Sequence, residues 1–340
     1  MDLNELHSIA MGMTSNGKGI LAADESSPTI KKRFDTIDAE STEANRRRYR
    51  EMLFTTSGAA DYIGGVILFD ETIRQATSDG VSFPKYLNDL GMIAGIKVDM
   101  GAKALAGFPG ETVTEGLDGL RERLAEYVEF GARFAKWRAV IHIGDDIPTA
   151  YCLHANAHAL ARYAALCQEA GVVPIVEPEV LMDGAHSINR CEEVTIAALD
   201  AVFSALEAHK VVLEGIVLKP NMVISGSDAA DRAGPAEVAT ATLRVLRAHV
   251  PEAVAGIAFL SGGQTAEEAT EHLGLMNEDG PFAWELSFSY GRALQAPALD
   301  AWRGSEDNFA AGQNALFKRA RLNSLAHLGQ YQTSMETEAA

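Results

Sequence analysis

Eight short apolar or β-branched runs recur along the chain, and they constrain its fold more than any other feature. The segments between them place apolar side chains three and four positions apart with charges opposite, which is typical of amphipathic helices. Strands that alternate with helices in this way run parallel, because each helix carries the chain back to the start of the sheet. The eight runs span residues 19–24, 62–70, 94–99, 134–143, 172–180, 215–223, 256–263 and 283–291.

The regular repetition of these units favours a closed barrel. No Pro-, Gly- or Ser-rich linker divides the chain, so we predict an α/β protein with a single (β/α)8 TIM barrel over residues 1–331. An open doubly wound sheet is the alternative fold. Residues 2–16 and 305–328 fall outside the eight units and are predicted to form extra N- and C-terminal helices. Residues 332–340 are mostly polar, and we expect a flexible C-terminal tail there.

Composition argues against several classes of partner. The net charge of -18 repels nucleic acids and acidic membranes. The longest apolar run ends at Glu177, far short of the roughly 18 residues that a membrane span requires. The first residues lack the basic and apolar segments of a signal peptide. We therefore expect a cytoplasmic protein with no nucleic-acid and no membrane partner.

Polar residues end most of the apolar runs, which is unusual because buried charges are rare without a partner or a task. In a parallel barrel, the carboxyl ends of the strands converge at one mouth, where active sites lie. Anionic substrates of so acidic a chain need a local group of cations. The residues expected at this mouth are Asp24, Lys97, Lys136, Arg138, Glu177, Lys219, Ser261 and Arg292.

Lys219 has the features of a carbonyl-attacking lysine. A lysine in a dry pocket beside other cations is partly neutral and can attack a carbonyl, and Pro220 favours an extended backbone before it. Glu177 and Asp24 are candidate proton carriers. A structural ion pair is the competing interpretation for any single strand-end lysine. From the spacing alone, an enzyme site is the stronger prediction, and lysine chemistry is one possibility within it.

A turn of serine and glycines at the end of the seventh run suits a phosphate. Ser261-Gly262-Gly263 offers a hydroxyl and unobstructed backbone N–H groups, and Gly291-Arg292 adds a cation. A plain tight turn is the alternative interpretation of the glycines.

Seven sequence motifs are distributed over nearly the whole chain. They are Leu21-Ala22-Ala23-Asp24-Glu25-Ser26, Gly95-Ile96-Lys97-Val98-Asp99, Phe134-Ala135-Lys136-Trp137-Arg138, Pro174-Ile175-Val176-Glu177-Pro178-Glu179, Leu218-Lys219-Pro220-Asn221-Met222, Phe259-Leu260-Ser261-Gly262-Gly263-Gln264 and Phe288-Ser289-Tyr290-Gly291-Arg292-Ala293-Leu294-Gln295. In these motifs the chain resembles class I fructose-bisphosphate aldolase. They occur in the family's order, so chance agreement is negligible.

The resemblance implies reversible cleavage of fructose 1,6-bisphosphate into dihydroxyacetone phosphate and glyceraldehyde 3-phosphate, in glycolysis and gluconeogenesis, with no metal and no cofactor. Lys219 matches the family's Schiff-base lysine, and Glu177 matches the acid/base for carbinolamine dehydration. Lys136 matches the lysine that assists it electrostatically. Asp24 matches the aspartate that handles the C4 hydroxyl proton. The resemblance also implies a homo-oligomer, a tetramer in the family.

Phosphate contacts are carried over in the same way. The ketose phosphate site matches Ser261, Gly262, Gly291 and Arg292. Cations facing the sugar and the second phosphate match Lys97 and Arg138. Further contacts to the second phosphate match Thr29, Lys32 and Arg33.

Two departures from the family pattern bear on these expectations. Ser26-Ser27-Pro28-Thr29 replaces the usual Ser-Thr-Gly-Ser, so a proline that fixes φ stands in place of a glycine. Animal members end in a terminal tyrosine that aids proton exchange on the enamine, whereas the last tyrosine here is Tyr331. We therefore expect cleavage to be retained, with proton exchange slow or served by another group.

Two other functions are weighed against the aldolase. A metal-dependent barrel lyase predicts that chelator abolishes activity. A non-catalytic phosphate-binding scaffold predicts that phosphate binds but no imine is trapped. The complete set of Asp24, Lys136, Glu177 and Lys219 argues against the scaffold, because strand-end charges are costly to keep without a use.

Overall fold

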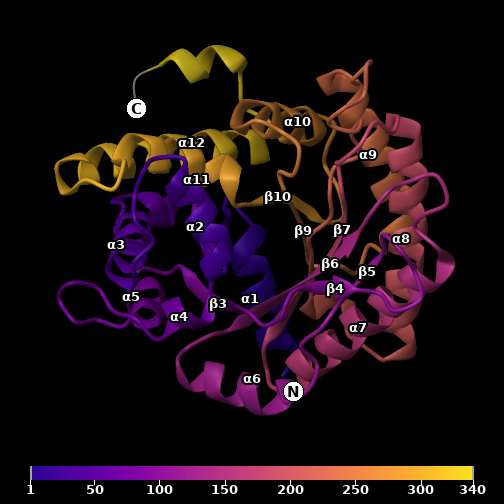
Figure 1. Ribbon diagram of the computed structural model, residues 1–340, viewed down its shortest axis with the longest axis horizontal. Helices are drawn as coiled ribbons and strands as arrows, with labels where there is room; N and C mark the ends of the chain where they lie inside the picture. Colours follow the sequence, from indigo (N-terminus) through magenta and orange to yellow (C-terminus); the bar gives the residue numbers. More distant parts are fainter. Residues whose placement is uncertain (1, 339–340) are drawn as a thin grey trace.

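The structure, a computed structural model that describes residues 2–338, contains a closed barrel of eight parallel strands with helices around it (Figure 1). The strands are hydrogen-bonded in the order β1-β10-β9-β8-β7-β6-β3-β2. The predicted (β/α)8 TIM barrel is therefore confirmed, and the open sheet is wrong. The barrel strands are β1 (Gly19–Ala22), β2 (Ile63–Leu68), β3 (Ile93–Lys97), β6 (Phe134–Ile141), β7 (Val173–Val180), β8 (Val217–Leu218), β9 (Gly256–Phe259) and β10 (Glu285–Tyr290).

Helices cover the outside of the barrel and close its N-terminal end. No helix among residues 2–338 is both long and apolar enough to cross a membrane. The α-helices are α1 (Leu3–Thr14), α2 (Ser27–Asp35), α3 (Glu43–Phe54), α4 (Asp70–Ile73), α5 (Phe83–Asp89), α6 (Leu120–Glu129), α7 (Ala150–Glu169), α8 (Ile188–Ala208), α9 (Pro235–His249), α10 (Ala266–Glu278), α11 (Arg292–Trp302) and α12 (Phe309–His327). Short 3-10 helices are η1 (Ala59–Asp61), η2 (Leu213–Gly215), η3 (Glu306–Asn308) and η4 (Thr333–Thr337).

One small element was not expected from the sequence. The connection between β3 and β6 carries an antiparallel hairpin of β4 (Ala102–Ala104) and β5 (Thr112–Thr114). Each strand has only three residues, and β4 is exposed throughout. Such a short, solvent-facing pair lacks the alternation of apolar and polar residues by which strands are recognised.

The barrel interior is filled by small and branched side chains and the Phe134 ring, and α1 closes its N-terminal end. Side chains from six of the eight strands join Leu6, Ala10 and Met13 of α1 in one cluster. Space inside is tight, because a Cβ at Gly95 would meet the Phe134 ring at 2.3 Å. The inward side chains in this cluster are Ile20, Ala22, Ile67, Phe134, Val173, Ile175, Val217 and Ala258.

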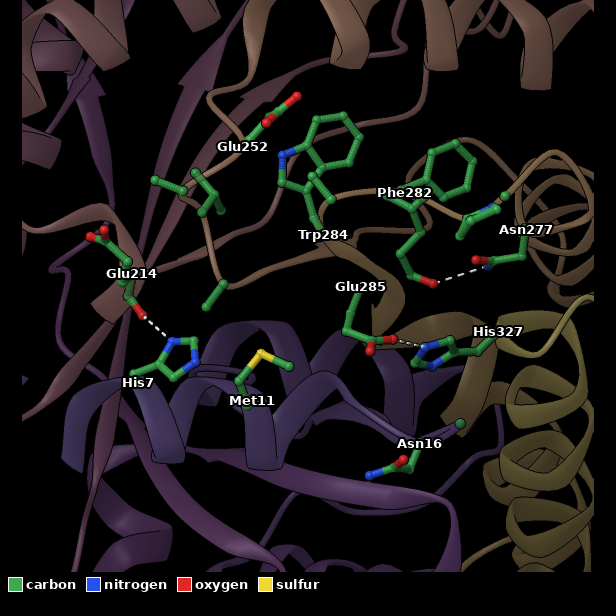
Figure 2. Close-up of a pocket in the computed structure, with 18 of the residues that line it drawn as sticks. His7, Met11, Asn16, Glu214, Glu252, Asn277, Phe282, Trp284, Glu285 and His327 are labelled. Atoms are coloured by element: carbon green, nitrogen blue, oxygen red, sulfur yellow. Dashed lines mark hydrogen bonds and ion pairs between the residues drawn. The ribbon is translucent and has the colours of Figure 1, made fainter. Parts of the chain in front are cut away.

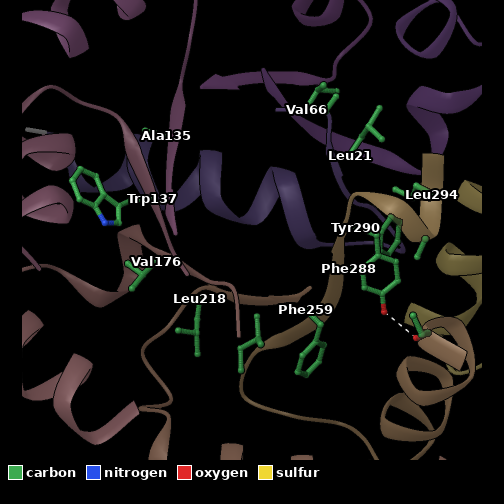
Figure 3. Close-up of a cluster of buried hydrophobic side chains, with 14 of the residues drawn as sticks. Leu21, Val66, Ala135, Trp137, Val176, Leu218, Phe259, Phe288, Tyr290 and Leu294 are labelled. Atoms are coloured by element: carbon green, nitrogen blue, oxygen red, sulfur yellow. Dashed lines mark hydrogen bonds between the residues drawn. The ribbon is translucent and has the colours of Figure 1, made fainter. Parts of the chain in front are cut away.

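The alternate residues of the same strands face the helices. Leu21, Val176 and Leu218 belong to the larger core between barrel and helices, which Figure 3 shows as a ring of side chains around the strands. Successive side chains in a strand point to opposite faces, so the residue two positions beyond each inward side chain also points inward. This parity decides which strand-end residues reach the barrel mouth.

The last residues of the described chain pack on α10 and α12. Glu336, in η4, forms ion pairs with Arg319 at 2.6 Å, and Tyr331 donates a hydrogen bond to Glu336 at 2.9 Å. The predicted flexible tail covers 332–340, of which 339–340 lie outside the described residues.

Candidate active site

A cavity of about 260 Å3 opens at the carboxyl ends of the strands and gathers nearly all the residues that the sequence predicted for the site. Lys32 is the exception: it is exposed and does not line the cavity. The predicted residues that line it are Asp24, Thr29, Arg33, Lys97, Lys136, Arg138, Glu177, Lys219, Ser261, Gly262, Gly291 and Arg292.

Strand parity explains why the reactive residues meet. Asp24, Lys136, Glu177 and Lys219 each stand two positions after an inward side chain of the barrel interior. They therefore point into the barrel axis, one layer above the apolar filling. A charge in this layer is surrounded by neighbouring strands rather than by water.

These four residues form a line of alternating charge. Lys219 Nζ lies 3.2 Å from Glu177 Oε1, and Lys136 Nζ lies 3.4 Å from Glu177 Oε2. Lys136 Nζ also lies 2.7 Å from Asp24 Oδ2. The side chains of Lys219, Glu177 and Lys136 are at most 5% exposed, so the line is shielded from solvent and its charges act strongly on one another.

Burial and ion pairing determine the charge of Asp24 and Lys136. Burial alone would raise the pKa of Asp24, but Lys136, followed by Lys219 and Lys97, holds that pKa well below its usual range. Burial alone would lower the pKa of Lys136, but Asp24 and Glu177 raise it far above its usual range. Asp24 is thus a carboxylate and Lys136 an ammonium at any pH near neutrality.

Glu177 keeps one oxygen available for chemistry. Its Oε2 is buried and receives no hydrogen bond within the described residues, although the Lys136 ammonium is near. A buried carboxylate oxygen without a hydrogen bond is costly, and a substrate hydroxyl or water is the natural partner. Glu177 is therefore the member of the line best placed to move a proton.

The end of the cavity that is predicted to bind a phosphate is made of glycines and the start of α11. A Cβ on Gly262 would meet Met182 Cε at 2.1 Å, and Gly263 has a φ of +72°, so neither position accepts a side chain without movement. Arg292 is the first residue of α11, where free N–H groups and the helix dipole favour an anion. Together with Ser261, this corner offers a cation, a hydroxyl and backbone donors.

Across the cavity, the cations are held by acids. Lys97 Nζ lies 2.8 Å from Asp99 Oδ1, Arg138 is paired with Glu179, and Arg33 is paired with Glu25. Each guanidinium or ammonium group is thus preorganised before a ligand binds.

Only two of the three predicted second-phosphate contacts on helix α2 lie at the cavity. Thr29 and Arg33 are four residues apart and share the face of α2 that lines the cavity. Lys32 lies on another face of the helix and is exposed. Pro28 stands in the first turn of α2, where its missing N–H has no intrahelical partner to lose, so the departure from the family pattern is compatible with the helix.

Sequence reasoning missed several lining residues, of which Ser289, Glu179 and Glu25 matter most for the site. Ser289 lies two positions after the inward Ser287, is 1% exposed, and has a hydroxyl with no partner among the described residues. Glu179 is the counterion of Arg138, and Glu25 binds Arg33 and Arg50. The parity that places Glu177 also places Ser289 and Glu179, so this signal was present in the sequence.

Comparison with known proteins agrees with the geometry. The sequence model of the family described as "Fructose-bisphosphate aldolase class-I" matches residues 5–340. The chain belongs to the class I fructose-bisphosphate aldolase family. Members of this family act on sugar phosphates, and the protein is accordingly an enzyme of the aldehyde-lyase class.

Individual relatives cover almost the whole chain. The "Probable fructose-bisphosphate aldolase class 1" of Xanthomonas campestris pv. campestris is 57% identical over 97% of this chain and 99% of its own. The "Fructose-bisphosphate aldolase 4, cytosolic" of Arabidopsis thaliana is 52% identical over 96% of this chain and 84% of its own. The Plasmodium falciparum aldolase, solved in a ternary complex with TRAP and a small-molecule inhibitor, matches with a TM-score of 0.96 and 48% identity, covering 97% of this chain and 96% of that chain.

Proposed function

We propose that this aldolase cleaves fructose 1,6-bisphosphate reversibly into dihydroxyacetone phosphate and glyceraldehyde 3-phosphate, through an imine on Lys219, in glycolysis and gluconeogenesis in the cytoplasm. The observation that carries the proposal is the buried line Lys219–Glu177–Lys136–Asp24, with the Lys219 amine 3.2 Å from Glu177 Oε1.

The first half of the reaction uses Lys219 and Glu177. The Lys219 ammonium passes a proton to Glu177, and the free amine attacks the C2 carbonyl of the open-chain sugar to form a carbinolamine. Glu177 then gives a proton to the C2 hydroxyl, which leaves as water, and the lone pair on nitrogen completes the iminium. Lys136 stays charged beside Glu177 and stabilises its carboxylate form between these transfers.

The second half uses Asp24. Its carboxylate takes the proton of the C4 hydroxyl, the C4 carbon becomes an aldehyde, and the electrons of the C3–C4 bond pass into the iminium to give an enamine. Glyceraldehyde 3-phosphate leaves. Protonation of the enamine at C3 and hydrolysis of the resulting imine release dihydroxyacetone phosphate and restore the lysine.

The substrate would lie across the cavity with a phosphate at each end. Ser261, Gly262, Gly291 and Arg292 hold the ketose phosphate. Thr29, Arg33, Lys97 and Arg138 face the sugar and the second phosphate, and Lys32 adds a more distant charge. Ser289, with its unpartnered buried hydroxyl, is a hydrogen-bond donor for the sugar near Lys219.

Assembly and the tail are part of the same proposal. By family resemblance, the protein forms a homotetramer, which size-exclusion chromatography with light scattering tests. Cleavage does not need residues 332–340, the predicted C-terminal tail.

The test of the proposed reaction is steady-state cleavage of fructose 1,6-bisphosphate in the presence of a metal chelator. We expect full activity in chelator and inactivation by borohydride only when dihydroxyacetone phosphate is present. Loss of activity in chelator would favour the metal-dependent lyase. Phosphate binding without cleavage would favour the scaffold.

A further inference from the structure

A second cavity, of about 590 Å3, lies at the N-terminal end of the barrel. It is bounded by α1, the loops that precede β9 and β10, and the end of α12 (Figure 2). None of the residues proposed for the aldolase reaction lines it. Its volume falls in the range of small-molecule sites.

The side chains that line this cavity differ in charge from those of the active site. Three carboxylates line it, Glu214, Glu252 and Glu285, and no lysine or arginine is among the lining residues that the structure describes. Figure 2 shows the three on different sides of the cavity. Glu285 is paired with His327 at 3.0 Å, whereas Glu214 and Glu252 form no ion pair within residues 2–338.

Two aromatic side chains line the cavity next to Glu252 (Figure 2). The Trp284 indole donates a hydrogen bond to the Pro251 carbonyl at 3.0 Å and stacks on Phe282, with ring centroids 6.2 Å apart. These contacts fix the indole before any ligand arrives. A tryptophan face near carboxylates is the surface that attracts organic cations.

The spacing of the groups separates an organic cation from a metal ion. Residues 2–338 contain no group of three or more His, Cys, Asp or Glu side chains that could hold a metal. Carboxylates on different walls are better matched by a ligand with a charge at each end, and the partly exposed Met11 adds apolar surface for the carbon chain between.

We propose that this cavity binds a small aliphatic diamine in its doubly protonated form. One ammonium group lies at Glu252 beside the Trp284 ring, the other at Glu214, and the methylene chain covers Met11. The site is separate from the Lys219 site, and its occupation does not depend on the aldolase reaction.

Isothermal titration calorimetry of the full chain with 1,4-diaminobutane tests this proposal at physiological salt. We expect saturable binding with one diamine per chain and none of 1,4-butanediol, which has the same length without the charges. Glu252→Gln and Glu214→Gln should each weaken binding about fivefold, which is the order expected for partly exposed ion pairs. Because the two carboxylates lie on different walls, their effects should be independent. The double variant should therefore bind the diamine more weakly by the product of the two single factors.

Controls separate this site from general attraction to an acidic protein. Glu267→Gln, an exposed residue at the start of α10 that does not line the cavity, should leave diamine binding unchanged, as should Lys219→Met. The absence of saturable binding would overturn the proposal. It would be equally overturned if butanediol bound as well, or if Glu267→Gln weakened binding as much as Glu252→Gln.

Discussion

The two ends of the barrel treat charge in opposite ways. At the carboxyl end, Lys219, Glu177 and Lys136 are almost fully buried, and each lies within 3.4 Å of an opposite charge. At the amino end, Glu214 and Glu252 are exposed, and no lysine or arginine is among the residues that line their cavity. Buried, mutually paired charges hold fixed positions, whereas exposed carboxylates of one sign attract a mobile cation.

This difference follows from the direction of the strands. Along a strand such as β7, the inward side chains begin with apolar Val173 and Ile175 and end with Glu177 and Glu179. All eight strands run the same way, so the polar ends collect at one mouth and α1 closes the apolar end. Catalysis is therefore expected only at the carboxyl end, and substitutions at the two ends should have very different effects.

The largest effect is expected from Lys219→Met. This change removes the proposed nucleophile and leaves Glu177 paired with Lys136, so the fold should persist while kcat falls by about 10^4 or more. Steady-state cleavage of fructose 1,6-bisphosphate measures it. Lys85→Met, at an exposed ion pair with Asp89, is the matched control and should change kcat less than about twofold. Comparable losses in both variants would contradict the assignment.

Glu177→Gln should follow with a smaller loss. The amide keeps the shape of the side chain but cannot carry a proton, so kcat should fall by roughly 10^2 to 10^3. Glu237→Gln, in the exposed first turn of α9, gives the same change of charge away from the mouth. A Glu177→Gln enzyme with unaltered kcat at every pH would mean that another group moves the proton.

A buried histidine beside Gln264, the residue after the Ser261-Gly262-Gly263 turn, should make stability depend on pH. Burial lowers the pKa of His272 to about 4, and its Nδ1 lies 2.7 Å from Gln264 Oε1. An unfolded histidine has a pKa of about 6.5, so the unfolded state binds the proton first as pH falls. The contribution of neutral, buried His272 to the free energy of unfolding is therefore complete above about pH 6.5. Roughly 3 kcal/mol of this free energy is lost when the pH falls to about 4.

Urea unfolding between these two pH values measures this loss. His272→Gln removes the titrating group and should flatten the part of the pH profile that His272 causes, while Lys219→Met should leave that slope unaltered. An identical slope in His272→Gln would show that other groups cause the acid sensitivity.

The smallest effect on turnover is expected at the C-terminus. Deletion of residues 332–340 removes the Glu336 contacts to Arg319 and Tyr331 but nothing that lines the active-site cavity. Turnover should stay within about twofold, while the melting temperature falls by a few degrees, as expected for the loss of about 1 kcal/mol. A large drop in kcat in the folded deletion variant would mean that the tail takes part in proton exchange.

Much of the fold and the site was predictable from one rule: the position of a residue along its parallel strand decides where its side chain lies. The alternation of eight strand-like runs with helical segments indicated the barrel, and strand-end position indicated Lys136, Glu177 and Lys219. The rule fails where a residue lies on a helix or is paired by tertiary contacts. Lys32 is adjacent to Arg33 in sequence, yet only Arg33 faces the cavity, because successive helical residues point about 100° apart.

The neutral and acidic residues that line the active-site cavity were harder to predict than the cationic ones. Ser289 was overlooked because an isolated serine in a strand has no signal of its own; only its register with Ser287 places it in the site. Glu25 was overlooked because its partner Arg50 comes from α3, and that contact exists only after folding. The cavity at the amino end combines α1 with loops before β9 and β10 and the end of α12, so no local pattern could indicate it.

Intact mass spectrometry after borohydride reduction tests the central claim most directly. The protein is mixed with dihydroxyacetone phosphate and sodium borohydride in chelator, beside Lys219→Met and Lys85→Met. The account predicts one reduced adduct per chain on the unaltered protein and on Lys85→Met, and none on Lys219→Met. An adduct that persists in Lys219→Met, or its absence from the unaltered protein despite bound phosphate, would contradict imine chemistry at this lysine.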